Sequence, residues 1–213
     1  MILAAGRGER LRPITDTTPK ALVEVRGQCL LERHLDAVKA AGVDTVVINL
    51  GWLGEQIADR IGSGASYGLA VVYSPEGDDV LETGGGIHRA LPMLGDEAFL
   101  VVNADVYTDM PLPTVLDDDA AGHLVLVPKP AHRVHGDFDL VDGRVTNSET
   151  SSLTFSGVAL YRPEFFVDCK PGRFPLAPML RHAADALTLS GSVYEGMWED
   201  VGTVERLEEL NRR

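Results

Sequence analysis

The chain has 213 residues, of which 45% are hydrophobic and 24% are charged, and its formal net charge is −13 at pH 7. This length and composition are typical of one globular domain with a sizeable core, and no apolar run reaches the roughly 20 residues that a membrane span needs. The negative charge argues against binding of nucleic acid or an anionic membrane, so any phosphate ligand must be gathered by a local basic pocket.

Apolar segments rich in β-branched residues alternate with segments of helical periodicity over the first 130 residues. Strands are expected at residues 1–4, 45–50, 69–74, 99–107 and 123–128. Helices are expected between them, at residues 31–41, 53–61 and 87–94. This alternation predicts βαβ units, and therefore an α/β, Rossmann-like fold with a mostly parallel mixed sheet flanked by helices.

The pattern changes after about residue 130. We expect, in chain order, a hairpin at 137–147 with Asp142-Gly143 at its turn, a strand at 153–161, a helix at 176–186, a strand at 193–201 and a C-terminal helix capped by Thr203. The second part is expected to extend the same sheet and to form one wall of a cleft. Residues 1–213 are thus interpreted as a single domain.

Histidines and cysteines give no sign of a metal site or a disulfide framework. Cys29 and Cys169 are the only cysteines, and we interpret His132 and His135 as part of a surface loop. The first residues lack the basic start and cleavage site of a signal peptide, so a cytoplasmic protein is expected.

A glycine-rich turn, "LAAGRGERLRPITDTTPKAL" at residues 3–22, follows the first strand. Gly6 and Gly8 would let backbone N–H groups approach an anion closely. The dinucleotide pattern G-x-G-x-x-G fails because Leu11 stands at the third glycine, and Arg26 stands where an acidic residue would bind the ribose. The Walker pattern also fails, since no Gly-Lys-Ser/Thr follows.

What remains is G-x-G-x-R followed by Pro13 and by Pro19-Lys20. Pro13 prevents a regular helix, so the loop should be long and irregular. Arg10 and Lys20 can both bring positive charge to a triphosphate held by the loop. By composition alone, a solvated basic turn without a ligand is as good an interpretation of this segment as a phosphate-binding loop.

The longer segment "LAAGRGERLRPITDTTPKALVEVRGQCLLERHL" resembles the signature of the sugar-1-phosphate nucleotidyltransferases, L-x-A-G-x-G-x-R-L-x-P-x-T…P-K-x-L…V-x-G-x-P-L-L-E. Cys29 replaces the usual proline. The resemblance implies a fold of the nucleotide-diphospho-sugar transferase type, with a nucleotide-binding half at about 1–130 and a sugar-binding half at about 131–213. It also implies catalytic roles for Arg10 and Lys20. The implied nucleotide contacts in this loop are Ala5, Gly6, Gly8, Glu9, Arg10 and Lys20.

Two aspartates stand at predicted strand ends. Asp105 follows the apolar strand in "VVNADVY", and Asn103 shares its face of the strand, where open α/β sheets place their ligands. Asp200 lies in "WEDVGT", also at a predicted strand end. The alternative interpretation of Asp105 is that it only caps a helix or forms a turn. The resemblance makes Asp105 catalytic, makes Asp105 and Asp200 the ligands of Mg²⁺, and makes Asn103 a substrate contact; Mg²⁺ suits a few carboxylates completed by phosphate oxygens and water.

A second glycine-rich segment, "SPEGDDVLETGGGI" at residues 74–87, is expected to form a loop whose three glycines approach a flat ring. A flexible connector is the alternative. The resemblance implies that Glu76, Thr83 and Gly84 contact the nucleotide. Glu76 does not decide the base, because a carboxylate can accept hydrogen bonds from uracil, thymine or guanine.

This segment, together with "GDF" at 136–138 and "LTFSG" at 153–157, resembles the N-acetylmuramate α-1-phosphate uridylyltransferases of cell-wall recycling. That resemblance implies sugar contacts at Gly136, Ser156 and Gly157. Many relatives carry an E-K-P lysine for the sugar phosphate. No lysine lies between 137 and 160 and Lys129 comes too early, so another basic residue such as Arg133, or the metal ion, is expected to take its place.

The activity implied is transfer of a nucleotidyl group from an NTP, with UTP expected, to a sugar 1-phosphate, with Mg²⁺ as cofactor. A GTP-dependent mannose- or heptose-1-phosphate guanylyltransferase remains open. A non-catalytic nucleotide-sugar-binding regulatory protein is disfavoured by the joint presence of Arg10, Lys20, Asp105 and Asp200, and a nicotinamide oxidoreductase is disfavoured by Leu11. The sequence leaves the oligomeric state open and is compatible with a monomer.

Overall fold

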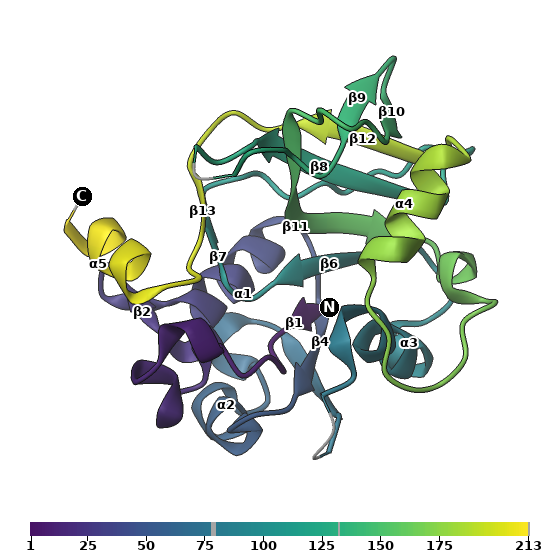
Figure 1. Ribbon diagram of the computed structural model, residues 1–213. Helices are drawn as coiled ribbons and strands as arrows, with labels where there is room; N and C mark the ends of the chain where they lie inside the picture. Colours follow the sequence, from purple (N-terminus) through teal and green to yellow (C-terminus); the bar gives the residue numbers. More distant parts are fainter. Residues whose placement is uncertain (78–79, 132, 213) are drawn as a thin grey trace.

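A computed structural model of the chain describes residues 1–77, 80–131 and 133–212, and its centre is a mixed sheet (Figure 1). Within these residues the sheet has nine strands in the order β5-β4-β1-β6-β11-β8-β12-β10-β9. Their bounds are β1 Ile2–Leu3, β4 Thr45–Leu50, β5 Ala70–Pro75, β6 Phe99–Asn103, β8 Gly122–Pro128, β9 Asp139–Val141, β10 Arg144–Thr146, β11 Leu153–Tyr161 and β12 Leu189–Val193. Strands β10 and β11 run against the others. The predicted α/β fold with a mostly parallel mixed sheet is confirmed.

Helices cover both faces of this sheet. Helices α1 (Leu30–Ala40) and α2 (Gly54–Ile61) pack with Val46 and Ile48 of β4 in one apolar cluster. Helices α3 (Glu82–Leu94) and α4 (Ala177–Asp185) pack with Val47 of the same strand in another. Alternate residues of a strand point to opposite faces, so the continuous apolar run of β4 serves two layers.

A small ribbon corrects two expected strands. The strand expected at 99–107 stops at Asn103, the chain turns at Ala104-Asp105, and β7 (Val106–Thr108) leaves the large sheet. There it pairs with β13 (Trp198–Asp200) as an antiparallel ribbon. The strand expected at 193–201 is also divided, because residues 189–193 form β12 beside β8 and only 198–200 enter the ribbon. Local apolarity could not show that the chain changes partners at these points.

The second glycine-rich segment is not the expected loop. Helix α3 begins at Glu82, earlier than the expected 87, and Gly84, Gly85 and Gly86 are buried inside it. Glycine is a poor helix former in isolation, so the packing around α3 overrides this local preference.

Other elements confirm the predictions for the second part. Strands β9 and β10 form a hairpin, with Asp142 and Gly143 both at positive φ. Helix α5 (Val204–Arg212) begins after Thr203, whose Oγ1 accepts a hydrogen bond from the Arg206 N–H at 3.4 Å. The shorter strands β2 (Glu24–Val25) and β3 (Gln28–Cys29) pair as a separate ribbon. No helix among the described residues has the length and apolarity needed to cross a membrane.

Candidate active site

Two adjoining pockets open where the parallel strands β1, β4 and β6 end. One has a volume of about 190 Å³ and the other of about 650 Å³. The smaller is lined by Leu3, Ala4, Ala5, Gly6, Lys20, Ala21, Asn49, Glu76, Val80, Glu82, Thr83, Asn103, Ala104 and Asp105. The larger is lined by Gly6, Arg7, Gly8, Glu9, Arg10, Lys20, Val80, Asp105, Arg173 and Gly202. Four shared residues join them, and the carboxyl ends of parallel strands are the usual ligand position in open α/β sheets.

The loop after β1 presents a row of backbone donors to the larger pocket. The N–H groups of residues 6–10 donate no hydrogen bond to another described residue. Gly8 has φ +64°, and a Cβ there would lie 3.0 Å from Thr15 and 3.1 Å from the Lys20 side chain. Leu11 is fully buried and anchors the loop in the core. Successive free N–H groups of this kind suit an oxyanion.

Lys20 contacts the carboxylate of Asp105 across the two pockets. The Lys20 side chain is 13% exposed and that of Asp105 is 35% exposed, so the pair faces the cavity rather than bulk solvent. The sequence motif and the strand end that predicted them lie far apart in the chain. The parallel pairing of β1 with β6 brings the two segments together, with Leu3 opposite Asn103.

Asp105 and Asp200 belong to neighbouring strand ends. The N–H of Val201 donates to the backbone carbonyl of Asp105 at 2.9 Å, which continues the β7–β13 ribbon. The Asp200 carboxylate contacts Arg206 of α5. In the described part of the chain no group of three or more His, Cys, Asp or Glu side chains could hold a metal ion. The expected ligands of Mg²⁺, Asp105 and Asp200, are two carboxylates, and such a donor set fits the preference of Mg²⁺ for one or two carboxylates completed by water and phosphate oxygens.

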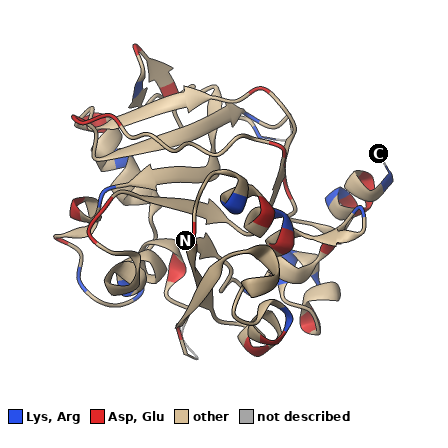
Figure 2. Cartoon of the chain, turned by 180° about the vertical axis from the view of Figure 1, so that it is seen from behind, with Lys and Arg blue, Asp and Glu red and all other residues tan. Residues whose placement is uncertain are grey.

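Arg10 reaches the same corner. A Cβ on Gly202 would lie 3.2 Å from Arg10 Nη2 and 3.3 Å from Asp200 Oδ2. Gly202 therefore leaves room for the guanidinium and the carboxylate to approach the larger pocket. Figure 2 shows basic and acidic positions interspersed along the chain in that view.

Glu76 lines the smaller pocket and is almost fully buried. Its Oε1 accepts a hydrogen bond from Asn49 Nδ2 at 2.6 Å, and its Oε2 accepts one from the Leu81 N–H at 2.8 Å. Asn49 Oδ1 in turn accepts the Ala4 N–H at 2.7 Å. Each carboxylate oxygen keeps a second lone pair for a ligand. Asn49 was missed in the sequence, although a polar residue ending an apolar strand is the same signal that drew attention to Asn103.

The glycine run of α3 lies behind the pocket. Gly86 packs against Glu76, since a Cβ would lie 2.6 Å from Oε1. Gly84 packs against Phe174, and a Cβ would lie 2.5 Å from that ring. Thr83 lines the smaller pocket, whereas Gly84 does not line either pocket described above. These glycines permit close packing of the helix, which differs from the expected ring-reading loop.

The residues expected at the sugar are only partly brought together. Gly157 has φ +83° at the bulge of β11, and a Cβ there would lie 2.7 Å from Asn103 Nδ2, so these two residues are in contact. Ser156 is buried, and its carbonyl accepts a hydrogen bond from Trp198 Nε1 at 2.9 Å. Gly136 packs on the backbone of Leu153. Neither pocket is lined by Gly136, Ser156 or Gly157.

One cationic side chain that lines the larger pocket was not predicted from the sequence. Arg133, the suggested replacement for the absent lysine, pairs with Asp137 at 3.2 Å and does not line either pocket. Arg173 lines the larger pocket instead, and its Nε donates to Glu82 Oε1 at 2.8 Å. Nothing in the local sequence of Arg173 marks it. His132 lies outside the described residues, and His135 is exposed.

His34 of α1 stands behind Asp105. It is buried, its Nε2 has no hydrogen-bond partner among the described residues, and burial lowers its pKa to about 4. The nearby charge of Asp105 opposes that shift. His34 is therefore neutral near pH 7 and contributes no positive charge to the site.

Comparison with known proteins identifies the family. Residues 1–133 match the model of the MobA-like NTP transferase domain. An N-acetylmuramate alpha-1-phosphate uridylyltransferase of Neisseria meningitidis is 48% identical over 98% of this chain and 95% of its own, and one of Caulobacter vibrioides is 34% identical over 95% and 90%. A Bacillus anthracis structure described as a glucose-1-phosphate thymidylyltransferase superposes with a TM-score of 0.84 at 20% identity, covering 99% of this chain and 92% of that one, which supports the fold. The chain therefore belongs to the MobA-like NTP transferase family and, within it, is a sugar-1-phosphate nucleotidyltransferase.

Proposed function

We propose that this enzyme transfers the uridylyl group of UTP to N-acetylmuramate α-1-phosphate. The observation that carries the proposal is the 48% identity, over nearly the whole of both chains, to a relative with that activity. The joined pockets support it, because one holds the row of free N–H groups with Lys20 and Asp105 and the other holds Glu76. The larger pocket would take the phosphates of both substrates, and the smaller would take the base and the sugar beside Asn103.

The reaction is a substitution at phosphorus. A phosphate oxygen of the sugar 1-phosphate forms a bond to the α-phosphorus of UTP, the bond from that phosphorus to the bridging oxygen of the β-phosphate breaks, and pyrophosphate leaves with the electron pair. The attacking phosphate is already an anion near neutral pH, so no general base is required. Bringing two polyanions into line is the main obstacle, and positioning can supply about 7–11 kcal/mol in favourable cases.

We assign the loop of residues 6–10 to the β- and γ-phosphates. Its free N–H groups and the Arg10 guanidinium face the larger pocket, and fixed donors of this kind stabilise charge that grows on a leaving group. Lys20 would lie at the α-phosphate, because it contacts Asp105 where the two pockets meet. The four contacts assigned to the base end are Ala5, Glu76, Thr83 and Gly84, of which Gly84 would act through the packing of α3.

Asp105 and Asp200 would hold Mg²⁺ together with phosphate oxygens. Their carboxylates contact Lys20 and Arg206 here, and both lie beside the larger pocket. When bound, Mg²⁺ would neutralise phosphate charge and orient the α-phosphate. The protein residues would supply the remaining charge and fix the position of the substrates.

At the sugar end we assign Asn103, Gly157 and Ser156 to the sugar and Arg173 to its phosphate. Asn103 lines the smaller pocket and Gly157 packs against it. Arg173 lines the larger pocket, and a guanidinium can bind a phosphate through two parallel hydrogen bonds. Gly136 remains assigned by resemblance alone.

A substrate panel tests the proposal. The purified enzyme is given UTP, dTTP, GTP, CTP or ATP with N-acetylmuramate, N-acetylglucosamine, glucose, mannose or heptose 1-phosphate, and pyrophosphate release is followed together with product mass. We expect the highest kcat/KM for UTP with N-acetylmuramate α-1-phosphate, and loss of activity on chelation of divalent metal. Activity confined to GTP with mannose or heptose 1-phosphate would replace the uridylyl assignment with the guanylyl one.

A further inference from the structure

A glutamate with an unusual backbone conformation lines the smaller pocket and pairs with an arginine of the larger one. Glu82 has φ 60°, in the left-handed region that residues with a side chain rarely adopt. Glu82 begins α3, and Val80, two residues before it, lines both pockets. Such strain is kept only where the surrounding structure holds it, and it concentrates at functional sites.

The Glu82 carboxylate holds one edge of a guanidinium. Arg173 Nε donates to Glu82 Oε1 at 2.8 Å, while among the described residues Nη1 and Nη2 of Arg173 have no hydrogen-bond partner. The Arg173 side chain is 68% exposed and lines the larger pocket. Fixing Nε sets the plane of the guanidinium and leaves its two terminal nitrogens for an oxyanion.

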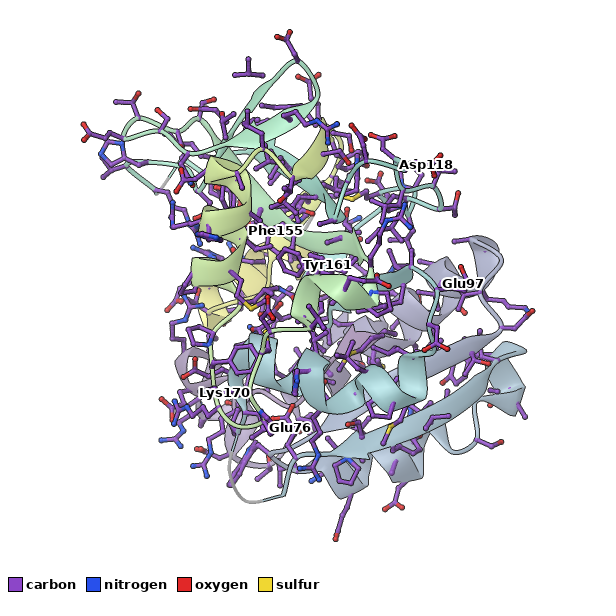
Figure 3. All side chains as sticks on the ribbon, turned by 90° about the vertical axis from the view of Figure 1, so that its right-hand side faces the viewer. Glu76, Glu97, Asp118, Phe155, Tyr161 and Lys170 are labelled. Carbon is purple, nitrogen blue, oxygen red and sulfur yellow. The ribbon has the colours of Figure 1, made fainter. Side chains whose placement is uncertain are left out.

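The backbone of Arg173 is fixed by the glycine run of α3. Phe174 N–H donates to the Leu81 carbonyl at 3.1 Å, and the Gly85 N–H donates to the Phe174 carbonyl at 3.1 Å. A Cβ on Gly85 would lie 2.3 Å from the Gly172 carbonyl oxygen, so only glycine admits this contact. Figure 1 shows the segment descending beside α3 before α4 begins, and Lys170 marks it in Figure 3.

We propose that Glu82 is a positioning residue that aims Arg173 at the phosphate of the sugar 1-phosphate. The segment 172–174 brings the Arg173 backbone to the pocket, and the Glu82 carboxylate restricts a long, exposed side chain that would otherwise sample many rotamers. This inference rests on the proposed function, which assigns Arg173 to that phosphate. On this inference, the glycine run of α3 and the left-handed backbone of Glu82 both serve to place the Arg173 guanidinium.

The experiment compares E82G, E82Q, R173A and the double variant E82G/R173A, with E97Q as a control at an exposed glutamate. KM and kcat are measured for each substrate by pyrophosphate release, and thermal unfolding is measured in parallel. We expect R173A to raise the KM for the sugar 1-phosphate at least about tenfold. E82G should raise it about three- to tenfold with kcat changed less than about twofold, as for a lost ground-state contact.

E82G also separates positioning from structural support. Glycine adopts φ 60° without strain, so the melting temperature should stay the same or rise while the sugar-phosphate KM worsens. E82Q keeps an oxygen that can accept the Arg173 Nε–H, and should restore part of the loss. In the R173A background, E82G should have no further effect on KM, since residues that act through one another are not additive.

The outcomes distinguish this inference from the proposed function. If R173A leaves the sugar-phosphate KM unchanged, the assignment of Arg173 fails and the role of Glu82 fails with it. If R173A raises that KM and E82G does not, only the positioning role is overturned. If E82G raises the KM equally in the presence and absence of Arg173, Glu82 contacts the substrate directly. If E82G lowers the melting temperature and the KM stays unchanged, Glu82 is merely structural.

Discussion

Lys20, in the short helical turn Lys20–Leu22 after the β1 loop, and Asp105, in the turn after β6, are in contact, and both line both pockets. The parallel pairing of β1 with β6 brings these two segments together. The contact places a positive and a negative charge together where the two pockets meet. A triphosphate entering the larger pocket would compete with Asp105 for Lys20. Each partner therefore tests a separate part of the proposed chemistry.

Replacing Lys20 by alanine should lower kcat by at least about a hundredfold, because a cation fixed at the α-phosphate stabilises charge that develops in the transition state. Steady-state pyrophosphate release measures the effect, with K39A as the control, since Lys39 is an exposed lysine paired with Asp44. A higher KM for UTP at unchanged kcat would instead assign Lys20 to binding of the ground state.

Replacing Asp105 by asparagine should abolish most turnover and raise the Mg²⁺ concentration needed for half-maximal rate, because a neutral amide is a weaker ligand for a hard cation. Mg²⁺ titrations of the wild type, D105N and D200N measure this, with D44N at an exposed position as the control. Unchanged turnover of D105N at saturating Mg²⁺ would contradict its assignment as a metal ligand.

The elements and pocket residues that could be predicted from the sequence are those marked by a local pattern of residues. The strands at 45–50 and 153–161 agree with the structure, because their apolar β-branched character reflects burial on two sides. Arg10 and Lys20 were predicted as site residues because their loop has a long ordered signature, and both line the larger pocket. Such signals depend on residues that are close in the chain.

The parts that sequence reasoning missed depend on contacts between distant segments. The glycines of α3 were predicted to form a loop because their local helix propensity is low. The residues that pack where their side chains would be are distant in the chain: segment 172–174 against Gly84 and Gly85, and Glu76 against Gly86. Arg173 had no signal of its own for the same reason. Asp105 was predicted to lie within one long strand at 99–107. The chain changes strand partner at 104–105, but the apolar character of the sequence continues through this point and gives no sign of the change.

Replacing Gly157 by alanine should impair sugar binding, since the new Cβ would lie 2.7 Å from Asn103 Nδ2 and push that amide out of place. We expect a several-fold higher KM for the sugar 1-phosphate and little change in the KM for UTP. G143A is a matched control, because Gly143 has a similar φ of +77° with nothing within 4 Å of its Cβ position. Equal kinetic effects of both variants would show that backbone strain alone is responsible.

Lowering the pH should destabilise the fold through His34. Burial lowers its folded-state pKa to about 4, below the ordinary value of 6.5, so the unfolded chain binds more protons between these values. The His34 contribution is complete above about pH 6.5 and decreases toward pH 4, by about 3 kcal/mol for this shift. Urea unfolding of the wild type and H34Q across this range measures it. The same pH slope in both proteins would contradict the prediction.

Replacing Gly85 by alanine should reverse the usual effect of that substitution. In an exposed helix interior, alanine stabilises by about 0.5–1 kcal/mol relative to glycine. Here the Cβ would lie 2.3 Å from the Gly172 carbonyl oxygen, so the helix or segment 172–174 must move. We expect a loss of about 1–3 kcal/mol in the free energy of unfolding, as for other overpacked sites.

The same displacement should carry Arg173 away from the larger pocket, so G85A should also raise the KM for the sugar 1-phosphate. Urea unfolding and steady-state kinetics test the two effects together, with M93A as the control at an exposed position of the same helix. If G85A is stabilised and its KM for the sugar 1-phosphate is unchanged, the close contact of segment 172–174 with Gly85 is not needed for stability or for substrate binding. Destabilisation without a change in KM would separate the packing of this segment from the placement of Arg173.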